Sequence, residues 1–360
     1  MEQVLKKPPH ICLIYTGGTI GMHPVMVDGE RVLRPPEKPE TFLEIAPELK
    51  ELATFEFVPL KKLKDSTNMN PQDWIDIAQE VYNRRDGGFD GFVIAHGTDT
   101  MHFSASAVAF ALGRNLNFPV VFTGAQTAPD VPHGDARVNL IRAFKVAASK
   151  KFAEVVICFG DYVFRGCRAQ KKDERRFDAF ESPAMFPLGY ITEEIVASPW
   201  AKTPKINPPP IHFKNKFATG IVQISLIPGL EPILLHPLLD LDDCKGIVLQ
   251  SFGAGNVPSE EPYALTNFIR EATNRGKPVL ITSQFPANAT LHTAYEPGKL
   301  AVAAGAIPTG NMTSACATAK FRWVLAQVEQ RSDLDNQGKM AEISEMMARA
   351  YIEELDEPKK

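Results

Sequence analysis

Apolar runs that end in polar, glycine-containing turns are the clearest pattern along the chain. Residues 92–95 are continuously apolar, and His-Gly-Thr-Asp-Thr follows at 96–100 before an alanine-rich helical pattern begins. Residues 11–15 lead in the same way into the turn 16–21. A strand buried on both faces of a parallel sheet reads as continuous apolar sequence, and ligands of such sheets bind beyond the carboxyl ends of the strands. We therefore expect the polar side chains of these two turns to share one pocket.

Strand and helix patterns alternate in both halves of the chain at the spacing of βαβ units. The order indicates an α/β protein with a larger N-terminal, mainly parallel sheet flanked by helices and a smaller C-terminal α/β domain. The first half predicts strands at 11–15, 54–60, 90–95, 119–123 and 154–159 and helices at 41–52, 71–85, 101–114 and 134–149. The second half predicts strands at 220–227, 246–252 and 278–283 and helices at 260–275, 313–329 and 339–355.

A proline-rich segment separates the two halves. Residues 198–217 contain five prolines, three of them consecutive, which is typical of a linker. The chain of 360 residues is also longer than a single core usually grows. We expect an N-terminal catalytic domain over 1–197, the linker over 198–217 and a C-terminal domain over 218–360.

Composition and charge exclude several classes of function. The 39 basic and 43 acidic residues give a formal net charge of −4, so there is no electrostatic reason to expect nucleic acid or an anionic membrane as a partner. No apolar run approaches the roughly 18 residues of a membrane span, and the polar N-terminus lacks a secretory core. The five cysteines are scattered without C-x-x-C spacing, which favours free thiols over a zinc site. We expect a cytoplasmic protein.

Common nucleotide and hydrolase motifs do not fit the sequence. The segments 16–21 and 253–258 nearly match the dinucleotide fingerprint, but Thr16 and Pro258 stand where glycines belong. Walker A, H-E-x-x-H and nucleophile-elbow serine motifs do not occur. ATPases, zincins and elbow-type serine hydrolases therefore lose their main support.

Hydroxyl and carboxyl side chains gather just past the predicted strand ends. A helix N-cap would explain any one of them, but capping does not require so many at one edge of one sheet. A hydroxyl is a weak nucleophile until a base removes its proton, and a lysine can do this when burial or a nearby cation lowers its pKa from about 10.4. The basic segment 165–176 supplies candidate lysines. The gathered side chains are those of Thr16, Thr19, Ser66, Thr98 and Asp99.

Two signatures, in this order, match a known family. The segments TGGTIGM (16–22) and HGTDTM (96–101) closely resemble those of the type I, cytoplasmic-type L-asparaginases of the asparaginase/glutaminase family. The likeness covers nearly the whole chain, and the signatures together with their companions are highly specific. The companions are 65–69, 123–126, Asp135 with Asn139, 165–171, 177–180 and 253–258.

The resemblance implies hydrolysis of L-asparagine to L-aspartate and ammonia through a covalent acyl-enzyme, without a metal or an organic cofactor. By position, Thr16 would be the nucleophile on a flexible first loop. Thr98, Lys171 and Asp99 would form a second, rigid triad that activates the nucleophile or the water. The sequence leaves open which threonine is acylated.

The resemblance also implies how a zwitterionic substrate is held. Asp99 would bind the α-ammonium group, and Ser66 would bind the α-carboxylate with help from the backbone at Gly97. Asn256 is a position that family members contribute across a dimer interface. The implied partners are a small-molecule substrate, L-asparagine and possibly L-glutamine, and a second or further copies in a homodimer or homotetramer. The expected substrate-binding residues are Gly17, Ser66, Thr67, Gly97, Thr98, Asp99 and Asn256.

One segment departs from the family. Residues 22–40 read as a long loop or a β-hairpin flap, and such segments beside strand ends are often lids. Family members usually carry a tyrosine there, yet this segment has none, and Arg31 lies roughly where it would fall. We therefore do not expect a flap phenol to activate Thr16.

Two other functions stay open. A related protein supplies ammonia to a tRNA-dependent amidotransferase, but it carries an extra N-terminal domain, whereas the first signature begins here at Thr16. A non-catalytic amino-acid sensor would keep the pocket without turnover. Retention of Thr16, Thr98, Asp99 and Lys171 together argues against a sensor, and the missing flap tyrosine argues for one.

Overall fold

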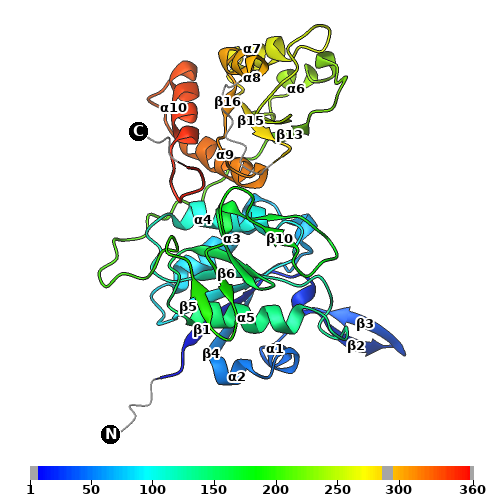
Figure 1. Cartoon of the computed structure of the whole chain (residues 1–360), viewed down its shortest axis with the longest axis vertical. Helices are drawn as coiled ribbons and strands as arrows, with labels where there is room; N and C mark the ends of the chain where they lie inside the picture. The colour runs from blue at the N-terminus through cyan, green and yellow to red at the C-terminus, as the bar shows by residue number, and fades with distance from the viewer. Residues whose placement is uncertain (1–6, 286–294, 357–360) are drawn as a thin grey trace. The chain divides into compact units, whose positions relative to one another are not determined.

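The computed structural model describes residues 7–285 and 295–356. Contacts within the chain divide it into two compact units, Met1–Asn215 and Lys216–Lys360. Each unit is an α/β structure with its own parallel strands (Figure 1).

The N-terminal unit is built on an eight-stranded sheet with the order β12-β11-β8-β7-β6-β5-β1-β4. The five neighbouring strands from β4 to β7 run parallel, and β8, β11 and β12 pair antiparallel. The prediction of a mainly parallel sheet is therefore confirmed. The strands are β1 (His10–Tyr15), β4 (Thr54–Pro59), β5 (Gly91–Ala95), β6 (Val120–Thr123), β7 (Val155–Phe159), β8 (Tyr162–Arg165), β11 (Gly189–Ile191) and β12 (Ile195–Ala197).

Helices cover the two faces of this sheet (Figure 1). Helices α1, α2 and α5 share one buried cluster with alternate strand residues such as Leu13 and Val93, as expected where successive side chains point to opposite faces. Helices α3 and α4 pack against each other, and α4 packs on β6 and β7. The helices are α1 (Glu40–Ile45), α2 (Leu49–Leu52), α3 (Pro71–Arg84), α4 (Met101–Leu112) and α5 (Ala136–Ala148).

The single helix predicted over 41–52 is wrong, because the structure has the two short helices α1 and α2 there. Pro47 lies between them. A residue that precedes proline is pushed out of the helical region, and Ala46 accordingly has φ −137° and ψ 84°. The break therefore follows from local backbone sterics.

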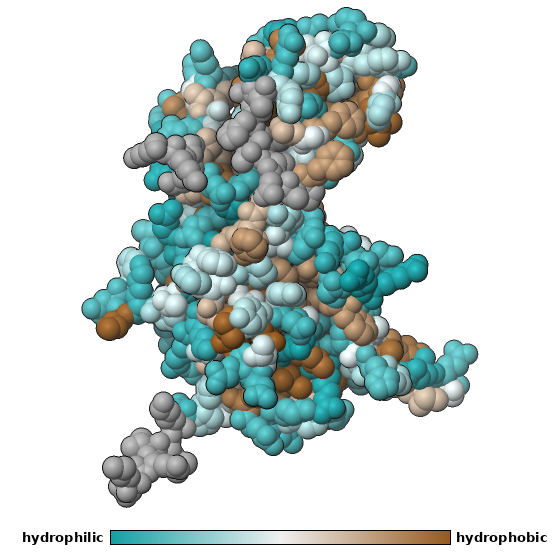
Figure 2. Space-filling model, viewed as in Figure 1, coloured by the Kyte–Doolittle hydropathy of each residue, from teal (hydrophilic) through white to brown (hydrophobic). Residues whose placement is uncertain are grey.

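The segment after the first strand is a β-hairpin, formed by β2 (His23–Val27) and β3 (Glu30–Arg34). Its two-residue turn is Asp28-Gly29, with φ 51° and 84°. Positive φ at both positions is what a type I′ hairpin turn requires, and Asp-Gly is a favoured sequence for it. The hairpin exposes Met26, Val32 and Leu33, and Figure 2 shows hydrophobic side chains on this projection.

The proline-rich segment lies along the N-terminal unit. The side chain of Asn115 donates to the carbonyl of Pro210 at 2.9 Å. The amide of Lys214 donates to the carbonyl of Ala111, also at 2.9 Å. The segment up to Asn215 therefore packs with this unit.

The C-terminal unit has a four-stranded parallel sheet in the order β13-β14-β15-β16. Its core gathers side chains of α7 and α8 against β14 and β15, among them Phe268 and Leu249. Helix α9 packs against α10 and β15. The elements are β13 (Ile221–Ser225), α6 (Pro237–Asp240), β14 (Gly246–Ser251), α7 (Thr266–Asn274), β15 (Val279–Ser283), α8 (Glu296–Ala303), β16 (Ile307–Pro308), α9 (Ser314–Val328) and α10 (Asn336–Ala348).

Two helix predictions in this unit have wrong boundaries. The helix predicted to begin at 260 begins at Thr266, because the chain first turns back so that the Leu265 amide donates to the Pro258 carbonyl at 2.9 Å. The helix predicted over 339–355 begins three residues earlier, at Asn336, and ends at Ala348, well before 355. The next residue, Arg349, has extended backbone and its carbonyl accepts from the buried ammonium of Lys320 at 2.6 Å, which is consistent with the early end.

Candidate active site

Three loops meet at the carboxyl edge of β1 and β5. Strands β1 and β5 are neighbours, and their register continues past the strand ends, because the Thr16 amide donates to the Ala95 carbonyl at 3.0 Å. The third loop follows β4, where the Lys64 amide donates to the Thr16 carbonyl at 3.0 Å. The structure therefore brings the first signature beside the second, as the strand pattern predicts.

Glycines allow these loops to touch. A Cβ on Gly17 would lie 2.1 Å from the Lys64 carbonyl oxygen, and one on Gly18 would lie 2.5 Å from the amide nitrogen of Gly97. A Cβ on Gly97 would in turn lie 2.7 Å from the Ser66 hydroxyl oxygen. Gly17 and Gly18 also have positive φ angles of 117° and 84°. Residues with a Cβ are strained in this backbone conformation, and glycine is not. The backbone of each signature is thus in direct contact with its neighbour.

A lysine, a threonine and an aspartate form a hydrogen-bonded group at this edge. Strand β9 (Gln170–Lys171) places the Lys171 ammonium 2.8 Å from the Thr98 hydroxyl and 2.6 Å from the Asp99 carboxylate. Thr98 is buried, and the Lys171 side chain is 11% exposed, whereas that of Asp99 is 53% exposed. The group therefore joins a sheltered hydroxyl to a carboxylate that a ligand can reach.

Gln126 is a residue of this group that the sequence predictions did not include. Its side-chain carbonyl oxygen, Oε1, accepts a hydrogen bond from the Thr98 hydroxyl at 2.9 Å. The backbone N–H of Gln126 donates to both carboxylate oxygens of Asp135, which also accepts from Thr127 and Asn139. The segment 123–126 and the pair Asp135 and Asn139 belong to the family likeness, and that was the signal that could have found Gln126.

The Ser66 turn supplies a second buried hydroxyl. Ser66 is 2% exposed and begins the 3-10 helix Ser66–Asn68. The Thr100 hydroxyl donates to the Ser66 carbonyl at 2.7 Å. Thr67 is placed differently, because its hydroxyl and its amide both donate to Asp65 and so lower the pKa of that carboxyl. The side chain of Thr67 therefore holds the turn together.

The hydroxyl of Thr16 is buried and donates to the Ala95 carbonyl at 3.2 Å. The preceding residue, Tyr15, is also buried, and its phenol donates to the Gly18 carbonyl at 3.0 Å. Burial raises the pKa of Tyr15. Tyr15 thus supports the turn of the first signature as a neutral phenol.

Two histidines beside the site are kept neutral. Burial lowers the pKa of His96 to about 4, and burial together with the charge of Lys171 lowers the pKa of His102 to about 4. His96 donates from its Nδ1 to the Gly97 carbonyl at 2.7 Å. Its Nε2 and the Nδ1 of His102 are buried and have no hydrogen-bond partner among the described residues. Neither imidazole therefore adds positive charge near Lys171 at neutral pH.

Asn256 belongs to the C-terminal unit, whereas the residues above belong to the N-terminal one. Its backbone forms a bridge with Phe252, with hydrogen bonds of 2.8 and 3.1 Å. Asn256 lines a cavity of about 390 Å³ together with Tyr263 and Pro297. The structure therefore groups six of the predicted residues with Thr16 and places Asn256 within its own unit. The six are Gly17, Ser66, Gly97, Thr98, Asp99 and Lys171.

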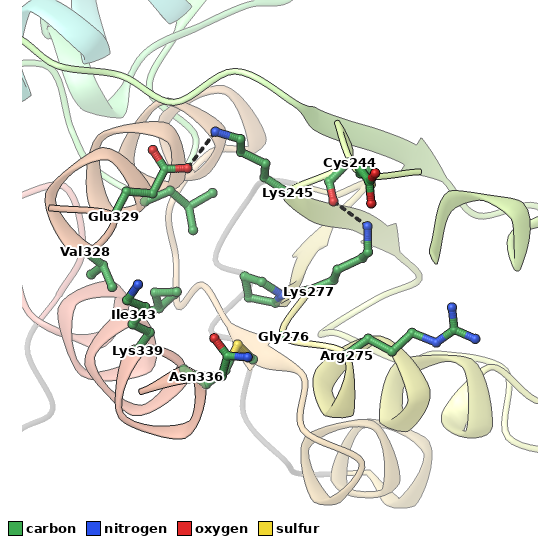
Figure 3. A pocket seen from close by; sticks show the side chains of 14 residues that line it. Cys244, Lys245, Arg275, Gly276, Lys277, Val328, Glu329, Asn336, Lys339 and Ile343 are labelled. Carbon is green, nitrogen blue, oxygen red and sulfur yellow. Dashed lines mark hydrogen bonds and ion pairs between the residues drawn. The ribbon is translucent and has the colours of Figure 1, made fainter. Parts of the chain in front are cut away.

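A further cavity of about 380 Å³ in the C-terminal unit is rich in lysine (Figure 3). Lys245 donates to the Glu329 carboxylate at 2.8 Å, and Lys277 donates to the carbonyls of Leu241 and Cys244 at 2.6 and 2.8 Å. These two ammonium groups stabilise the fold, and we assign no ligand to the cavity.

Within residues 7–285 and 295–356, no group of three or more His, Cys, Asp or Glu side chains is arranged to hold a metal ion. Over the same residues, none of the helices is long and apolar enough to cross a membrane.

Comparison with known proteins places this geometry in a family. The profile "Asparaginase, N-terminal" matches residues 10–203, and the profile "Glutaminase/Asparaginase C-terminal domain" matches residues 221–337. A component of the glutamyl-tRNA(Gln) amidotransferase of Aeropyrum pernix is 33% identical over 333 residues, which are 89% of this chain and 75% of that protein. L-asparaginase 1 of Escherichia coli K12 is 32% identical over 331 residues, 88% of this chain and 92% of that protein.

Solved structures agree with the sequence comparisons. The thermostable L-asparaginase from Thermococcus kodakarensis aligns with a TM-score of 0.83 at 30% identity, covering 97% of this chain and 100% of that chain. L-asparaginase I from Vibrio cholerae aligns with a TM-score of 0.82 at 30% identity, covering 97% and 99%. By fold, by sequence and by its two signatures, the chain belongs to the asparaginase family.

Proposed function

We propose that this protein hydrolyses L-asparagine to L-aspartate and ammonia through a threonine acyl-enzyme. The observation that carries the proposal is the contact of the Lys171 amine with both the Thr98 hydroxyl and the Asp99 carboxylate. Lys171 can act as a general base on a hydroxyl, and the Asp99 carboxylate can bind the ammonium group of an amino acid. The L-asparaginases of Escherichia coli, Thermococcus kodakarensis and Vibrio cholerae among the relatives support the substrate.

In the proposed reaction the Thr16 hydroxyl oxygen attacks the side-chain amide carbon of asparagine. Once the substrate ammonium has taken Asp99 and Lys171 has lost a proton to solvent, the proton of Thr16 passes through the Thr98 hydroxyl to the Lys171 amine. From there it passes to the leaving nitrogen, which departs as ammonia when the C–N bond breaks. Water then attacks the ester, the same residues accept its proton, and aspartate leaves with Thr16 restored. Thr16 is held beside β5, the strand that leads into the turn with Thr98, by its hydrogen bonds to Ala95.

Recognition follows from the charges of the substrate. The exposed carboxylate of Asp99 is proposed to take the α-ammonium group, and the Ser66 hydroxyl the α-carboxylate, at the contact between Ser66 and Gly97. In the free protein Lys171 neutralises Asp99. A substrate ammonium that competes for Asp99 would leave Lys171 freer to act on Thr98.

The first test is ammonia release from purified protein with L-asparagine and with L-glutamine over a wide concentration range. We expect turnover of asparagine and a loss of at least about a thousandfold in Thr16→Ala, because removal of a nucleophile leaves only residual catalysis. Thr16→Ser is the matched control, since it keeps the hydroxyl. Folded protein that releases no ammonia from asparagine would contradict the proposal and favour the sensor.

A second candidate is supply of ammonia to a tRNA-dependent amidotransferase. It is favoured by the amidotransferase components of Aeropyrum pernix and of Methanothermobacter thermautotrophicus, which are 33% and 30% identical to this chain. An asparaginase that works alone releases ammonia at full rate without a partner. Turnover that appears only when a partner protein and charged tRNA are added would favour the second candidate.

We also propose that the protein acts in the cytoplasm as a homodimer or homotetramer, the assembly in which Asn256 would reach a neighbouring copy's site. Light scattering of the purified protein gives the number of copies. In a dimer, Asn256→Ala would lower turnover without changing the assembly.

A further inference from the structure

We infer that Lys64 is a positioning residue of the active site, which holds the turn at residues 64–66 against both signatures. The inference rests on the proposed function, because it concerns the placement of Thr16 and Ser66. Lys64 belongs to neither signature, and its role follows from contacts within the N-terminal unit.

The backbone of Lys64 contacts the nucleophile loop. The Lys64 amide donates to the Thr16 carbonyl at 3.0 Å. The peptide of Lys64 also packs on Gly17 so closely that a Cβ there would lie 2.1 Å from the carbonyl oxygen and 2.7 Å from the nitrogen of Lys64. Any movement of the Lys64 backbone therefore moves the backbone of Thr16 and Gly17.

Two residues later the same turn contacts the second signature. The Thr100 hydroxyl donates to the Ser66 carbonyl at 2.7 Å, and Gly97 packs against the Ser66 side chain. The turn therefore contacts both the loop that carries Thr16 and the loop that carries Thr98 and Asp99.

The Lys64 side chain anchors this turn to a helix. Its ammonium lies 2.7 Å from each carboxylate oxygen of Asp73, the third residue of α3. Asp73 also accepts the Asn70 amide at 2.8 Å and so fixes the start of α3. The Lys64 and Asp73 side chains are 21% and 9% exposed, so water screens this pair less than an ion pair on the surface.

Loss of the ion pair would release the turn at one end while the backbone contacts remain. Catalysis is sensitive to such a change, because a displacement of about 1 Å at a reacting group can cost about a hundredfold in rate. Substrate binding through Ser66 and attack by Thr16 should both weaken. If Lys64 only stabilised the fold, its substitution would lower the free energy of unfolding and leave kcat and KM of the folded fraction unchanged.

The test compares Lys64→Met with Lys62→Met, a matched change at an exposed lysine of the same loop. For L-asparagine, kcat/KM of Lys64→Met should fall at least about tenfold, with kcat reduced and KM raised. Lys62→Met should stay within about twofold of the original protein. Lys64→Arg, which keeps a cation opposite Asp73, should recover most of the loss.

A second variant covers the case in which Lys64→Met does not fold. Asp73→Asn removes the charge and keeps an oxygen for the Asn70 amide, and it should show the same change in kcat and KM. Kinetic constants of Lys64→Met or Asp73→Asn equal to those of Lys62→Met would overturn the inference. If the original protein itself releases no ammonia, the proposed function fails first, and the two failures are thereby distinguished.

Discussion

The amine of Lys171 has two acceptors of different kinds, the neutral Thr98 hydroxyl and the charged Asp99 carboxylate. Thr98 donates its own proton to Gln126 in this arrangement. The hydroxyl therefore lies in a chain of donors from Lys171 to Gln126, which fixes its orientation. Residues in such a chain act as a unit, and their contributions to catalysis are not additive.

We predict that the double change Thr98→Ala with Lys171→Ala costs little more activity than either single change. Either change alone already breaks the proton path, so the second has nothing left to remove. The measurement is kcat/KM for L-asparagine in the two single variants and the double variant. If the fold loss in kcat/KM of the double variant equalled the product of the two single losses, the two residues would act independently.

At this scale the sequence predicted the positions of some site residues but not their contacts. Thr98 and Asp99 follow an apolar strand and could be placed at its carboxyl end. Lys171 is 72 residues further on and was assigned through the family resemblance, because no local pattern says which lysine of a basic segment folds back. The pairing of Lys64 with Asp73 could not be predicted, since it depends on the path of a turn.

Among the elements, the hairpin β2–β3 carries the departure from the family. Arg31, which lies where a tyrosine was expected, forms an ion pair with Asp130. Asp130 lies in the loop between Gln126, which accepts the proton of Thr98, and Asp135, which accepts from the backbone of Gln126. The ion pair therefore ties the hairpin to the loop that orients the proposed proton relay.

Arg31→Ala should loosen the hairpin and raise KM for L-asparagine several-fold, because it removes the ion pair that joins the hairpin to the loop containing Asp130. Hydrogen exchange at the amides of β2 and β3 should speed up in parallel. Arg34→Ala, at the exposed end of β3, is the matched control. If KM and the rates of amide hydrogen exchange were the same in both variants, Arg31 would not anchor the hairpin.

Local sequence signals predicted some element boundaries and not others. The helix predicted from residue 71 does begin at Pro71, where Asn70 forms a capping box, whereas the hairpin turn at Asp28-Gly29 was not singled out within 22–40. The end of α10 depends on Lys320, which comes from another helix. A helix end that depends on a side chain distant in sequence cannot be predicted from the residues around that end.

For the whole chain, stability should depend on pH through His96. Its pKa is lowered from 6.5 to about 4 by burial, so the unfolded chain binds a proton between these values and the folded chain does not. The stability contributed by the neutral imidazole is complete above pH 6.5 and is lost as the pH falls toward 4.

We expect His96 alone to make the protein about 2 kcal/mol less stable at about pH 5 than at about pH 7.5. Urea unfolding at the two pH values measures this difference. His96→Gln does not titrate and should show a smaller difference, whatever its stability at the higher pH. An unchanged difference in that variant would mean that other groups account for the acid sensitivity.

The C-terminal residues beyond α10 have a consequence for anyone who wishes to express the second unit by itself. The ammonium of Lys320 is fully buried, forms an ion pair with Glu354 at 2.7 Å and donates to the carbonyls of Met347 and Arg349. The family profile ends at residue 337, before all three acceptors. A fragment cut there would lose these acceptors together with most of α10, and breaking a buried ion pair by removing one partner costs about 3–5 kcal/mol. The useful boundary for such a fragment therefore lies after Glu354.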